Sequence, residues 1–478
     1  MPKLQPWVVI AARSARASDL SSFEGVLNGH ILKLSKILKS QRNMEILELK
    51  SPLEVEITLT ESCNHRCIHC YNPWREKSIG YRSLSYEQID FICNELQKCE
   101  VYSVVITGGE PTSKYDLLLY LIEKLRQCNI DYSLNSNITL LTLDQILELK
   151  SKGISHILTS LPSIYEDKFE HITQKKGSYS IFLKNLSLIN RCNIDITANM
   201  VITRKNVKEL DEIANFVKAY KIKGLTLSLV IPPKYNPDDK TYMLDNESVI
   251  KIADTLLYLK KEMGIYVNSL TPLPLCVLKD VDKYQSLVTT SCCAGIAICT
   301  IGADGNVQAC AHDTKNYGNI FQEGLSKCWE RMVDWRKAEH LNAECKECDY
   351  IGLCGGECRM LSTVHSNDKY TINKNAPIIF NPKEVPTLDL NSKYIINSNA
   401  IMREEPFGAS LIVCYKHIFV TKNIVALFNI MKRLGSFKIA DLLNYVEYND
   451  NFNSTIYYME QIGLIIKEQI NAIEKKAE

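Results

Sequence analysis

The sequence predicts an α/β fold: a parallel sheet, curved or closed into a barrel, followed by a cysteine-rich domain and a small C-terminal module. Three observations predict it. Strand-like and helix-like segments alternate about six times between residues 53 and 231, which is typical of a parallel sheet with right-handed crossovers. Ten of the 18 cysteines lie between Cys276 and Cys358. From about residue 390 to 470 the chain regains strand and helix patterns.

Six segments have the pattern of strands. In the first, residues 53–60, apolar and polar residues alternate with period two, as in a strand with one buried face. The others are residues 101–107, 130–136, 154–161, 194–203 and 224–231.

Helical patterns separate these strands. Residues 85–99 and 142–153 begin at Ser85 and Thr142, each followed three residues later by glutamine, which is the signature of a capping box. Residues 206–221 are amphipathic. We therefore expect crossover helices between the strands.

Composition limits the classes of function. The chain has 478 residues, 46% of them apolar, which is enough for roughly three domains. Its formal net charge of +1 provides no overall basic field for nucleic acid or an anionic membrane. Residues 7–12 form only a short apolar run, and no stretch approaches a membrane span, so we expect a soluble, cytoplasmic protein without a membrane partner. Cysteines in such a chain indicate metal or reactive thiols.

Polar and glycine-rich motifs follow the first three predicted strands. The sequence CNHRCIHC, residues 63–70, follows the first strand, TGGEP follows the second, and Asn137 follows the third. Because the carboxyl ends of parallel strands share one edge, these motifs should lie on one face. Gly108 and Gly109 would let a ligand approach the backbone, and Glu110 would add a carboxylate there. By itself, TGGEP is also compatible with a simple turn.

The three cysteines of the first loop are Cys63, Cys67 and Cys70. Such a group can be an incomplete zinc site, but this compact run better suits a cubane iron-sulfur cluster whose fourth iron is open. His65 and His69 lie in the same loop. As loop residues they are expected to pack or hydrogen-bond rather than to bind metal.

On this Cys-x3-Cys-x2-Cys motif and on TGGEP, residues 50–235 resemble the radical S-adenosylmethionine superfamily. The resemblance implies a partial (β/α)6 TIM-like barrel and a [4Fe-4S] cluster on Cys63, Cys67 and Cys70, with S-adenosylmethionine on the open iron. The family's cofactor contacts would fall on Gly108, Gly109 and Glu110 for the methionyl amino group, and on Asn137 and Ser160 for the carboxylate or ribose. His69 stands where the family usually has an aromatic residue beside the adenine.

The cysteine-rich segment resembles the SPASM domain, which carries auxiliary clusters in peptide-modifying radical enzymes. Two parts of its pattern are present: Cys-x2-Cys-x5-Cys-x3-Cys at Cys345, Cys348, Cys354 and Cys358, and Cys292 upstream of Gly305-x4-Cys310. Two auxiliary iron-sulfur clusters are implied. One would use Cys310 and Cys358 with two upstream cysteines, for which Cys276 and Cys292 are favoured over the alternatives Cys293 and Cys299. The other would use Cys345, Cys348 and Cys354.

The family's last cysteine has no nearby match. Cys328, Cys414 or an open site for substrate are the alternatives. Without the radical motif, residues 345–358 would also be compatible with a zinc ribbon.

The C-terminal region resembles the precursor-peptide recognition element, a winged-helix-like module. The resemblance rests on residues 402–421 followed by three helical patterns at 424–434, 439–449 and 454–465. It implies capture of a leader peptide as an added strand. A simple closing domain is an alternative. The last helical patterns carry acidic residues and almost no Arg or Lys, which argues against DNA as a partner.

Together these resemblances imply an enzyme that modifies a ribosomally made precursor peptide, forming a thioether from a cysteine sulfur to a carbon through a 5′-deoxyadenosyl radical. A low-potential donor such as flavodoxin or ferredoxin would supply the electron. The alternatives are carbon-carbon cross-linking or epimerisation, oxidation of a residue as sulfatase-maturating enzymes do, and an iron-sulfur redox regulator. The expected domains are an N-terminal helical extension (1–50), the barrel (51–265), the auxiliary-cluster domain (266–365), a linker (366–389) and the recognition element (390–470).

Overall fold

The computed structural model describes residues 48–72, 81–236, 239–287, 292–341, 343–348, 354–361, 385–413 and 416–468. The described residues up to 361 belong to one compact unit, and those from 385 onward belong to a second unit. The predicted N-terminal extension up to residue 47 and the predicted linker up to residue 384 lie outside the described residues.

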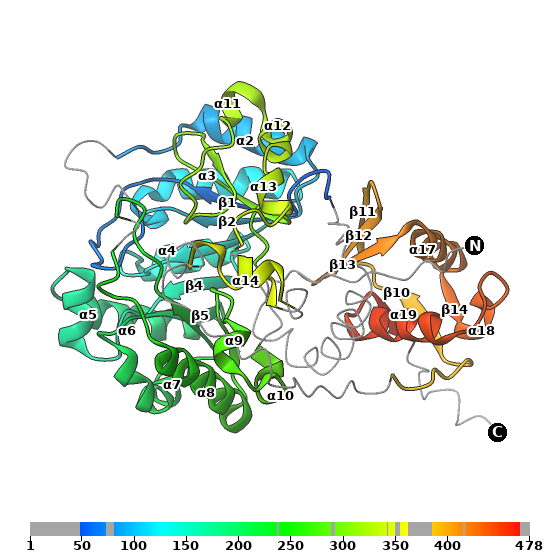
Figure 1. Cartoon of the computed structure of the whole chain (residues 1–478). Coiled ribbons are helices and arrows are strands. Elements are labelled where there is room, and N and C mark those ends of the chain that lie inside the picture. The colour runs from blue at the N-terminus through cyan, green and yellow to red at the C-terminus, as the bar shows by residue number, and fades with distance from the viewer. Residues whose placement is uncertain are drawn as a thin grey trace, which may run out of the picture. The chain divides into compact units, whose positions relative to one another are not determined.

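The first unit is built on a nine-stranded sheet of described strands in the order β7-β6-β5-β4-β3-β2-β1-β8-β9 (Figure 1). Every neighbouring pair is parallel except β8 with β9. The strands are β1 (Glu54–Thr58), β2 (Ser103–Thr107), β3 (Asp131–Ser136), β4 (His156–Ser160), β5 (Asp195–Ile202), β6 (Gly224–Leu229), β7 (Tyr266–Asn268), β8 (Ile298–Ile301) and β9 (Val307–Gln308). The predicted α/β fold with a parallel sheet is confirmed, and it is typical of a TIM-like barrel.

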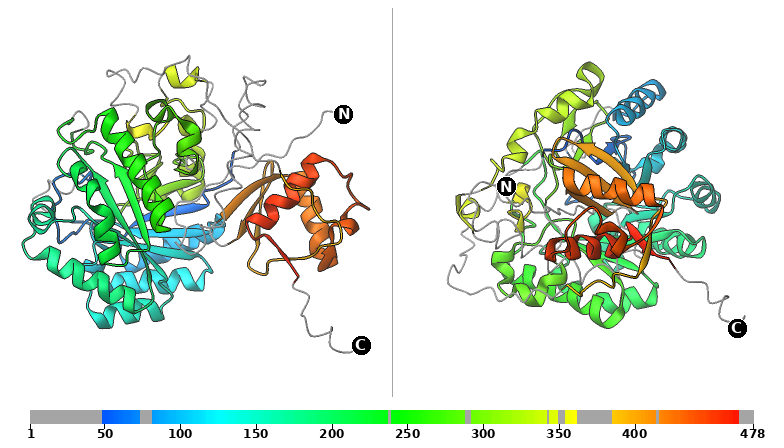
Figure 2. Two further views of the ribbon diagram at one scale, coloured as in Figure 1. Left: turned by 90° about the horizontal axis from the view of Figure 1, so that it is seen from below. Right: turned by 90° about the vertical axis from the view of Figure 1, so that its right-hand side faces the viewer.

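Helices connect the strands and lie outside the sheet (Figure 2). They are α2 (Tyr86–Lys98), η2 (Pro111–Lys114), α3 (Tyr115–Gln127), α4 (Leu143–Ser151), α5 (Glu166–Thr173), α6 (Ser178–Arg191), η3 (Val207–Asp211), α7 (Ile213–Ala219) and α8 (Asn246–Met263). Ser85 and Thr142 form the predicted capping boxes of α2 and α4. The single helix predicted over 206–221 is instead divided into η3 and α7. Within η3, the buried Glu209 carboxylate accepts hydrogen bonds from Ser163 Oγ and Ile164 N, which fix this turn against the loop after β4.

The cysteine-rich segment is continuous with the sheet, because β8 pairs in parallel with β1. Its short helices are α9 (Leu275–Leu278), α10 (Val281–Tyr284), η4 (Gln285–Leu287), α11 (Ile320–Glu323), α12 (Leu325–Glu330), α13 (Val333–Arg336) and α14 (Ala343–Lys346). Trp329 is buried and donates its indole N–H to Leu49 O at 2.9 Å. The ring of Phe321 packs edge-on against Phe91 of α2. These contacts hold the segment against the β1 side of the sheet.

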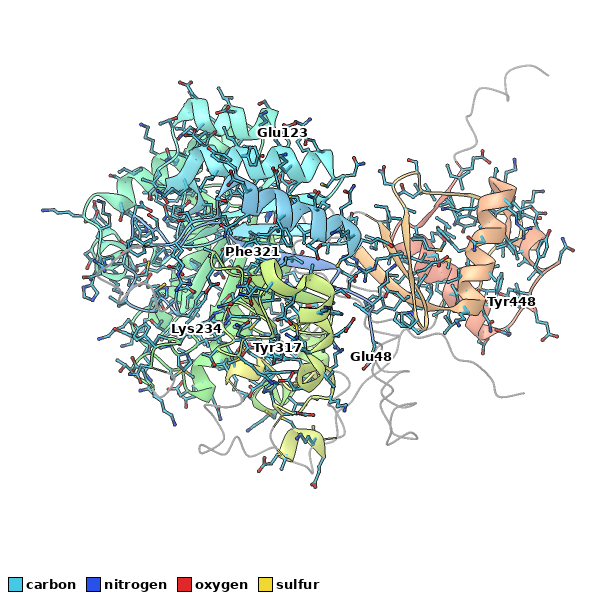
Figure 3. All side chains as sticks on the ribbon, turned by 90° about the horizontal axis from the view of Figure 1, so that it is seen from above. Glu48, Glu123, Lys234, Tyr317, Phe321 and Tyr448 are labelled. Carbon is cyan, nitrogen blue, oxygen red and sulfur yellow. The ribbon has the colours of Figure 1, made fainter. Side chains whose placement is uncertain are left out.

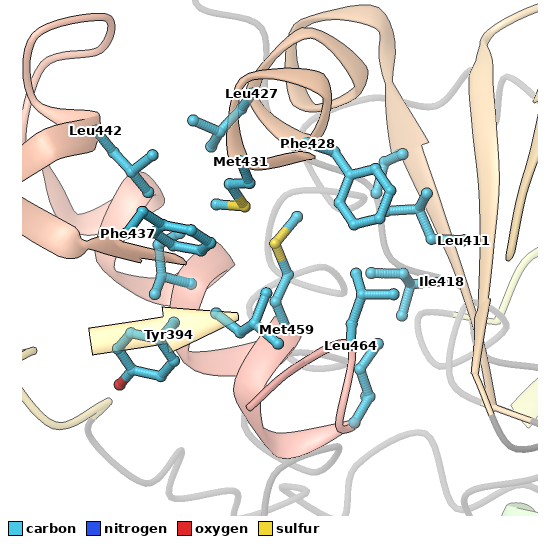
Figure 4. Close-up of a cluster of buried hydrophobic side chains, with 14 of the residues drawn as sticks. Tyr394, Leu411, Ile418, Leu427, Phe428, Met431, Phe437, Leu442, Met459 and Leu464 are labelled. Carbon is cyan, nitrogen blue, oxygen red and sulfur yellow. The ribbon is translucent and has the colours of Figure 1, made fainter. Parts of the chain in front are cut away.

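The described residues of the second unit form two small antiparallel sheets and three helices. One sheet has the order β11 (Ile401–Glu405), β12 (Gly408–Val413), β13 (Lys416–Thr421), and the other has the order β14 (Ser436–Lys438), β10 (Lys393–Ile396), β15 (Ile465–Lys467). The helices are α17 (Lys422–Leu434), α18 (Ile439–Leu442) and α19 (Asp450–Gln461). Its core joins Leu411 and Ile418 of the first sheet to Phe428, Met431 and Met459 of the helices (Figure 4).

Among the described residues, the structure contains no helix that is both long and apolar enough to span a membrane.

Candidate functional site: a cysteine loop at the carboxyl edge of the sheet

The motifs predicted to share one face follow adjacent parallel strands. Thr58 at the end of β1 pairs with Thr107 at the end of β2, and the next pairs continue through β3, β4 and β5. The cysteine loop, TGGEP and Asn137 therefore start at the same edge of the sheet, where this architecture places its ligands. Ser160 is the last residue of β4 at this edge, and its side chain is exposed.

Two glycines bring the β2 loop into contact with the cysteine loop. Gly109 N donates to Thr60 O and Glu110 N donates to Ser62 O, both at 2.7 Å. A Cβ atom on Gly108 would lie 2.4 Å from Thr60 O, and one on Gly109 would lie 2.4 Å from Ser62 O. Any larger residue would push the cysteine loop away, so these two positions require glycine for close approach.

Glu110 is buried beside the loop, and the chain's own donors satisfy its carboxylate. Its Oε1 accepts from Thr112 N and Oγ1 and from Ser136 Oγ, while its Oε2 accepts from Asn137 N at 2.7 Å. Burial raises the pKa of Glu110, and these hydrogen bonds oppose the rise. The carboxylate therefore links β2 to the end of β3 and adds negative charge near Cys63.

Asn137 fastens the end of β3 to the cysteine loop. Its Nδ2 donates to Asn64 Oδ1 at 2.8 Å, and its Oδ1 accepts from Thr139 Oγ1 at 2.6 Å. Asn64 Nδ2 in turn donates to Thr139 Oγ1, which also lies 3.2 Å from His65 Nε2. Sequence reasoning chose Asn137 by position but missed Asn64 and Thr139, because no local pattern marks them.

The two loop histidines lie in different environments. His65 is buried, and burial together with the charge of Lys175 lowers its pKa to about 4. It is therefore a neutral hydrogen-bonding group at physiological pH. His69 is half-buried within the loop.

The three loop cysteines are half-buried, and their surroundings fit an iron-sulfur cluster. Burial raises the pKa of the Cys63 thiol to about 12, and the charges of Glu110 and Cys70 act in the same direction. His65 N lies 3.4 Å from Cys63 Sγ as a donor. Such a thiol is protonated at neutral pH, and iron would have to replace the proton on binding.

Among the described residues, no three His, Cys, Asp or Glu side chains are placed to hold a single metal ion. Each cysteine of a cubane cluster binds a different iron, so such a cluster does not need three side chains on one metal ion.

The cysteine-rich segment reaches the same region through Cys310, which follows β9 and is buried. The ring of His312 packs on the ring of Tyr71, the residue after Cys70, with 4.0 Å between centroids. Lys234 lies in the loop after β6 (Figure 3). It donates its backbone N–H to Tyr71 O and its Nζ to Gln308 Oε1. Burial lowers the pKa of Lys234. Sequence reasoning missed this buried contact, although Tyr71 directly follows the third cysteine.

The other predicted cysteine ligands fall into two groups. Cys276 and Cys345 both interact electrostatically with Cys354 and with the buried Glu357, and Cys348 N donates to Cys345 O at 3.2 Å. Cys292 interacts with Arg359, whose chain neighbour Cys358 is buried. Cys414, one alternative for the last ligand, lies outside the described residues.

Residues 57–217 match the family model of the Radical SAM superfamily. Three relatives illustrate the range of similar proteins. The AdoMet-dependent heme synthase of Methanosarcina barkeri is 20% identical over 66% of this chain and 94% of its own length. A GTP 3′,8-cyclase of Clostridium botulinum is 27% identical over 61% of this chain and 93% of its own length. The mycofactocin maturase MftC of Mycolicibacterium smegmatis is 26% identical over 65% of this chain and 79% of its own length.

Two solved structures share the fold. Native anSMEcpe with bound AdoMet and the Cp18Cys peptide has a TM-score of 0.52 at 18% identity, covering 68% of this chain and 92% of that one. Streptococcus suis SuiB bound to the precursor peptide SuiA has a TM-score of 0.54 at 15% identity, covering 72% of this chain and 80% of that one.

Proposed function

We propose that this chain modifies a ribosomally made precursor peptide by radical chemistry, forming a thioether between a cysteine sulfur and a carbon. The observation that carries the proposal is the cysteine loop, held by Gly109 against the β2 loop and packed through Tyr71 against His312 of the cysteine-rich segment. A radical site and a candidate auxiliary site thus meet inside one compact unit.

Three loop cysteines, Cys63, Cys67 and Cys70, would hold the [4Fe-4S] cluster. With S-adenosylmethionine bound, that cluster would supply a 5′-deoxyadenosyl radical for hydrogen abstraction from the substrate. The protein's part is to hold the reactants in place and to keep water out. Gly108 and Gly109 leave room for backbone approach at the edge of the sheet, and Glu110 adds a negative charge suited to the methionyl amino group. Asn137, Ser160 and His69 remain proposed contacts of the cofactor.

Auxiliary clusters in the cysteine-rich segment would accept the electron released when the new bond forms, or bind the substrate thiolate. The position of Cys310 supports this role, because His312, two residues later, packs on Tyr71, the residue that follows Cys70. A low-potential flavodoxin or ferredoxin would provide the electron that starts each turnover.

The second unit supports a peptide substrate. Its sheet β11-β12-β13 is followed by α17, α18 and α19, the element order proposed for a precursor-peptide recognition element. Strands β11 and β13 each pair only with β12 among the described strands, so a leader segment can add to either edge. Streptococcus suis SuiB, which shares the fold, has been solved bound to the precursor peptide SuiA, and this likeness supports the same class of substrate here.

The experiment that tests the proposal measures 5′-deoxyadenosine after anaerobic reconstitution, reduction and addition of S-adenosylmethionine. We expect 5′-deoxyadenosine from the unmodified chain and none from Cys67→Ala. Cys354→Ala should retain part of the cleavage and lose peptide product. A reconstituted chain that never yields 5′-deoxyadenosine would reject the enzyme and favour an iron-sulfur redox regulator.

A further inference from the structure

The auxiliary site formed by Cys345, Cys348 and Cys354 lacks a fourth cysteine in the sequence pattern. A [4Fe-4S] cluster that only transfers electrons usually has four protein ligands. The structure brings a fourth thiol to this site from a distant part of the chain. That thiol belongs to Cys276, in the one-turn helix α9 that follows β7.

The backbone of α9 lies directly against the site. The N–H of Leu275, the residue before Cys276, donates a hydrogen bond to the Cys354 sulfur. Cys276 therefore starts from a backbone position next to a ligand sulfur. Pro274 precedes this turn with an extended backbone, and Cys276 is the second helical residue.

The charges that act on Cys276 come from the same group. Its thiol interacts with Glu357, Cys354 and Cys345, and the thiol of Cys345 interacts with Cys354, Glu357 and Cys348. Cys276 thus lies among the thiols that would hold this cluster, as a fourth ligand must.

The chain around Cys354 is shaped to support a charged sulfur. Gly355, Gly356 and Glu357 have φ angles of +67°, +82° and +56°, so three successive residues are left-handed. The N–H groups of Gly356 and Glu357 donate to the Cys354 sulfur, as Leu275 does. Backbone N–H groups that converge on a sulfur are a recurrent feature of iron-sulfur sites. A Cβ atom on Gly356 would lie 2.1 Å from Leu341 Cδ2, so this turn requires glycine.

We propose that Cys276 is the fourth ligand of the auxiliary cluster held by Cys345, Cys348 and Cys354. The inference rests on the proposed function, because it presupposes auxiliary clusters. The family pattern groups Cys276 with Cys292, Cys310 and Cys358. In this proposal Cys276 instead binds the other auxiliary cluster. It also ties the end of the barrel to the cysteine-rich segment and leaves no open iron for substrate at this cluster.

The competing ligand is Glu357, which is buried and whose pKa burial raises to about 7. Its carboxyl group interacts with the same cysteines. A carboxylate is the weaker donor for iron in a cubane, and thiolates are the usual ligands. Glu357→Gln is therefore a matched variant for the test.

The test uses the anaerobically reconstituted full chain and an alkylating reagent, with modified cysteines identified by mass spectrometry. A cysteine bound to iron does not react, and loss of its cluster exposes it. Two ligand variants are compared. We expect Cys348→Ala to release Cys276 for alkylation together with Cys345 and Cys354, while Cys292 stays protected. Cys310→Ala should release Cys292 and leave Cys276 protected.

The proposal is wrong if Cys276 becomes reactive toward the alkylating reagent in Cys310→Ala but not in Cys348→Ala. It is also wrong if Cys276 already reacts in the unmodified holoprotein. Iron content gives a second readout. Cys276→Ser should disturb or remove one cluster, up to about four iron atoms per chain, whereas Glu357→Gln should keep its iron. The reverse pattern would make Glu357 the ligand. Production of 5′-deoxyadenosine is scored separately, so failure of the proposed function is distinguishable from a wrong ligand.

Discussion

The ring of Tyr71 packs on the ring of His312 with 4.0 Å between centroids and an angle of 37°. Tyr71 directly follows Cys70, the third cysteine of the cysteine loop, and His312 lies two positions after Cys310. The contact therefore joins the cysteine loop, which would hold the radical cluster, to the loop of Cys310, a candidate ligand of an auxiliary cluster. We expect its loss to loosen both loops together.

A double-mutant cycle measures this coupling. Tyr71→Leu and His312→Leu should each lower stability, and the double variant should lose about 1 kcal/mol less than the sum of the two. Anaerobic urea denaturation followed by circular dichroism gives the four values. Strict additivity would show that the two rings do not support each other.

Gly109→Ala should displace the cysteine loop, because its Cβ would lie 2.4 Å from Ser62 O. We expect lower iron retention at the radical site and weak S-adenosylmethionine cleavage. Gly264→Ala is the control for general destabilisation, since its left-handed φ of +61° strains an alanine but nothing lies within 4 Å of a Cβ at that position. Equal iron content in the two variants would refute the close-approach role of Gly109.

His65 predicts a pH dependence of stability. Its pKa is lowered to about 4 in the folded chain from an ordinary value of 6.5, so the unfolded chain takes up the proton first as pH decreases. The free energy of unfolding should therefore fall by about 2 kcal/mol between pH 7 and pH 5 on account of this group. Urea denaturation at the two pH values measures it.

In His65→Gln that part of the pH dependence should disappear. His171→Gln, at an exposed position in α5, should leave it unchanged. If His65→Gln shows the full dependence of the unmodified chain, His65 is not the group responsible.

The second unit can be destabilised from its own core. Met459→Ala removes a fully buried side chain and should cost about 2–5 kcal/mol. We expect weaker binding of a labelled leader peptide, measured by fluorescence anisotropy, with 5′-deoxyadenosine formation retained. Tyr445→Ala, whose side chain is 55% exposed, is the control. Unchanged peptide affinity in a destabilised Met459→Ala would place leader recognition outside this unit.

Much of the first unit could be predicted from local patterns. The alternation of residues 53–60 and the capping boxes at Ser85 and Thr142 reflect hydrogen bonds and side-chain burial that are local in sequence. Because the strands are parallel, these elements also predicted that the cysteine loop, TGGEP and Asn137 share one edge.

Contacts between distant segments could not be predicted in this way. Strand β8 is only four residues long, Ile298–Ile301, and is buried throughout, so its pairing with β1 has no periodic signal. The hydrogen bond from Leu275 N to the Cys354 sulfur likewise joins residues far apart in the sequence, and it depends on the path of the chain after β7. The sequence pattern groups Cys276 with Cys292, Cys310 and Cys358, whereas in the fold its thiol interacts with Cys354 and Cys345.

The most direct test of the central claim is the intact mass of the small peptide encoded beside this gene, after anaerobic co-expression with the full chain. We predict the loss of two hydrogen atoms per modified site and a cysteine that no longer reacts with an alkylating reagent. The same loss with free thiols would favour a carbon-carbon bond, and an unchanged mass with deuterium uptake from solvent would favour epimerisation. A peptide with unchanged mass and no deuterium uptake would contradict the account.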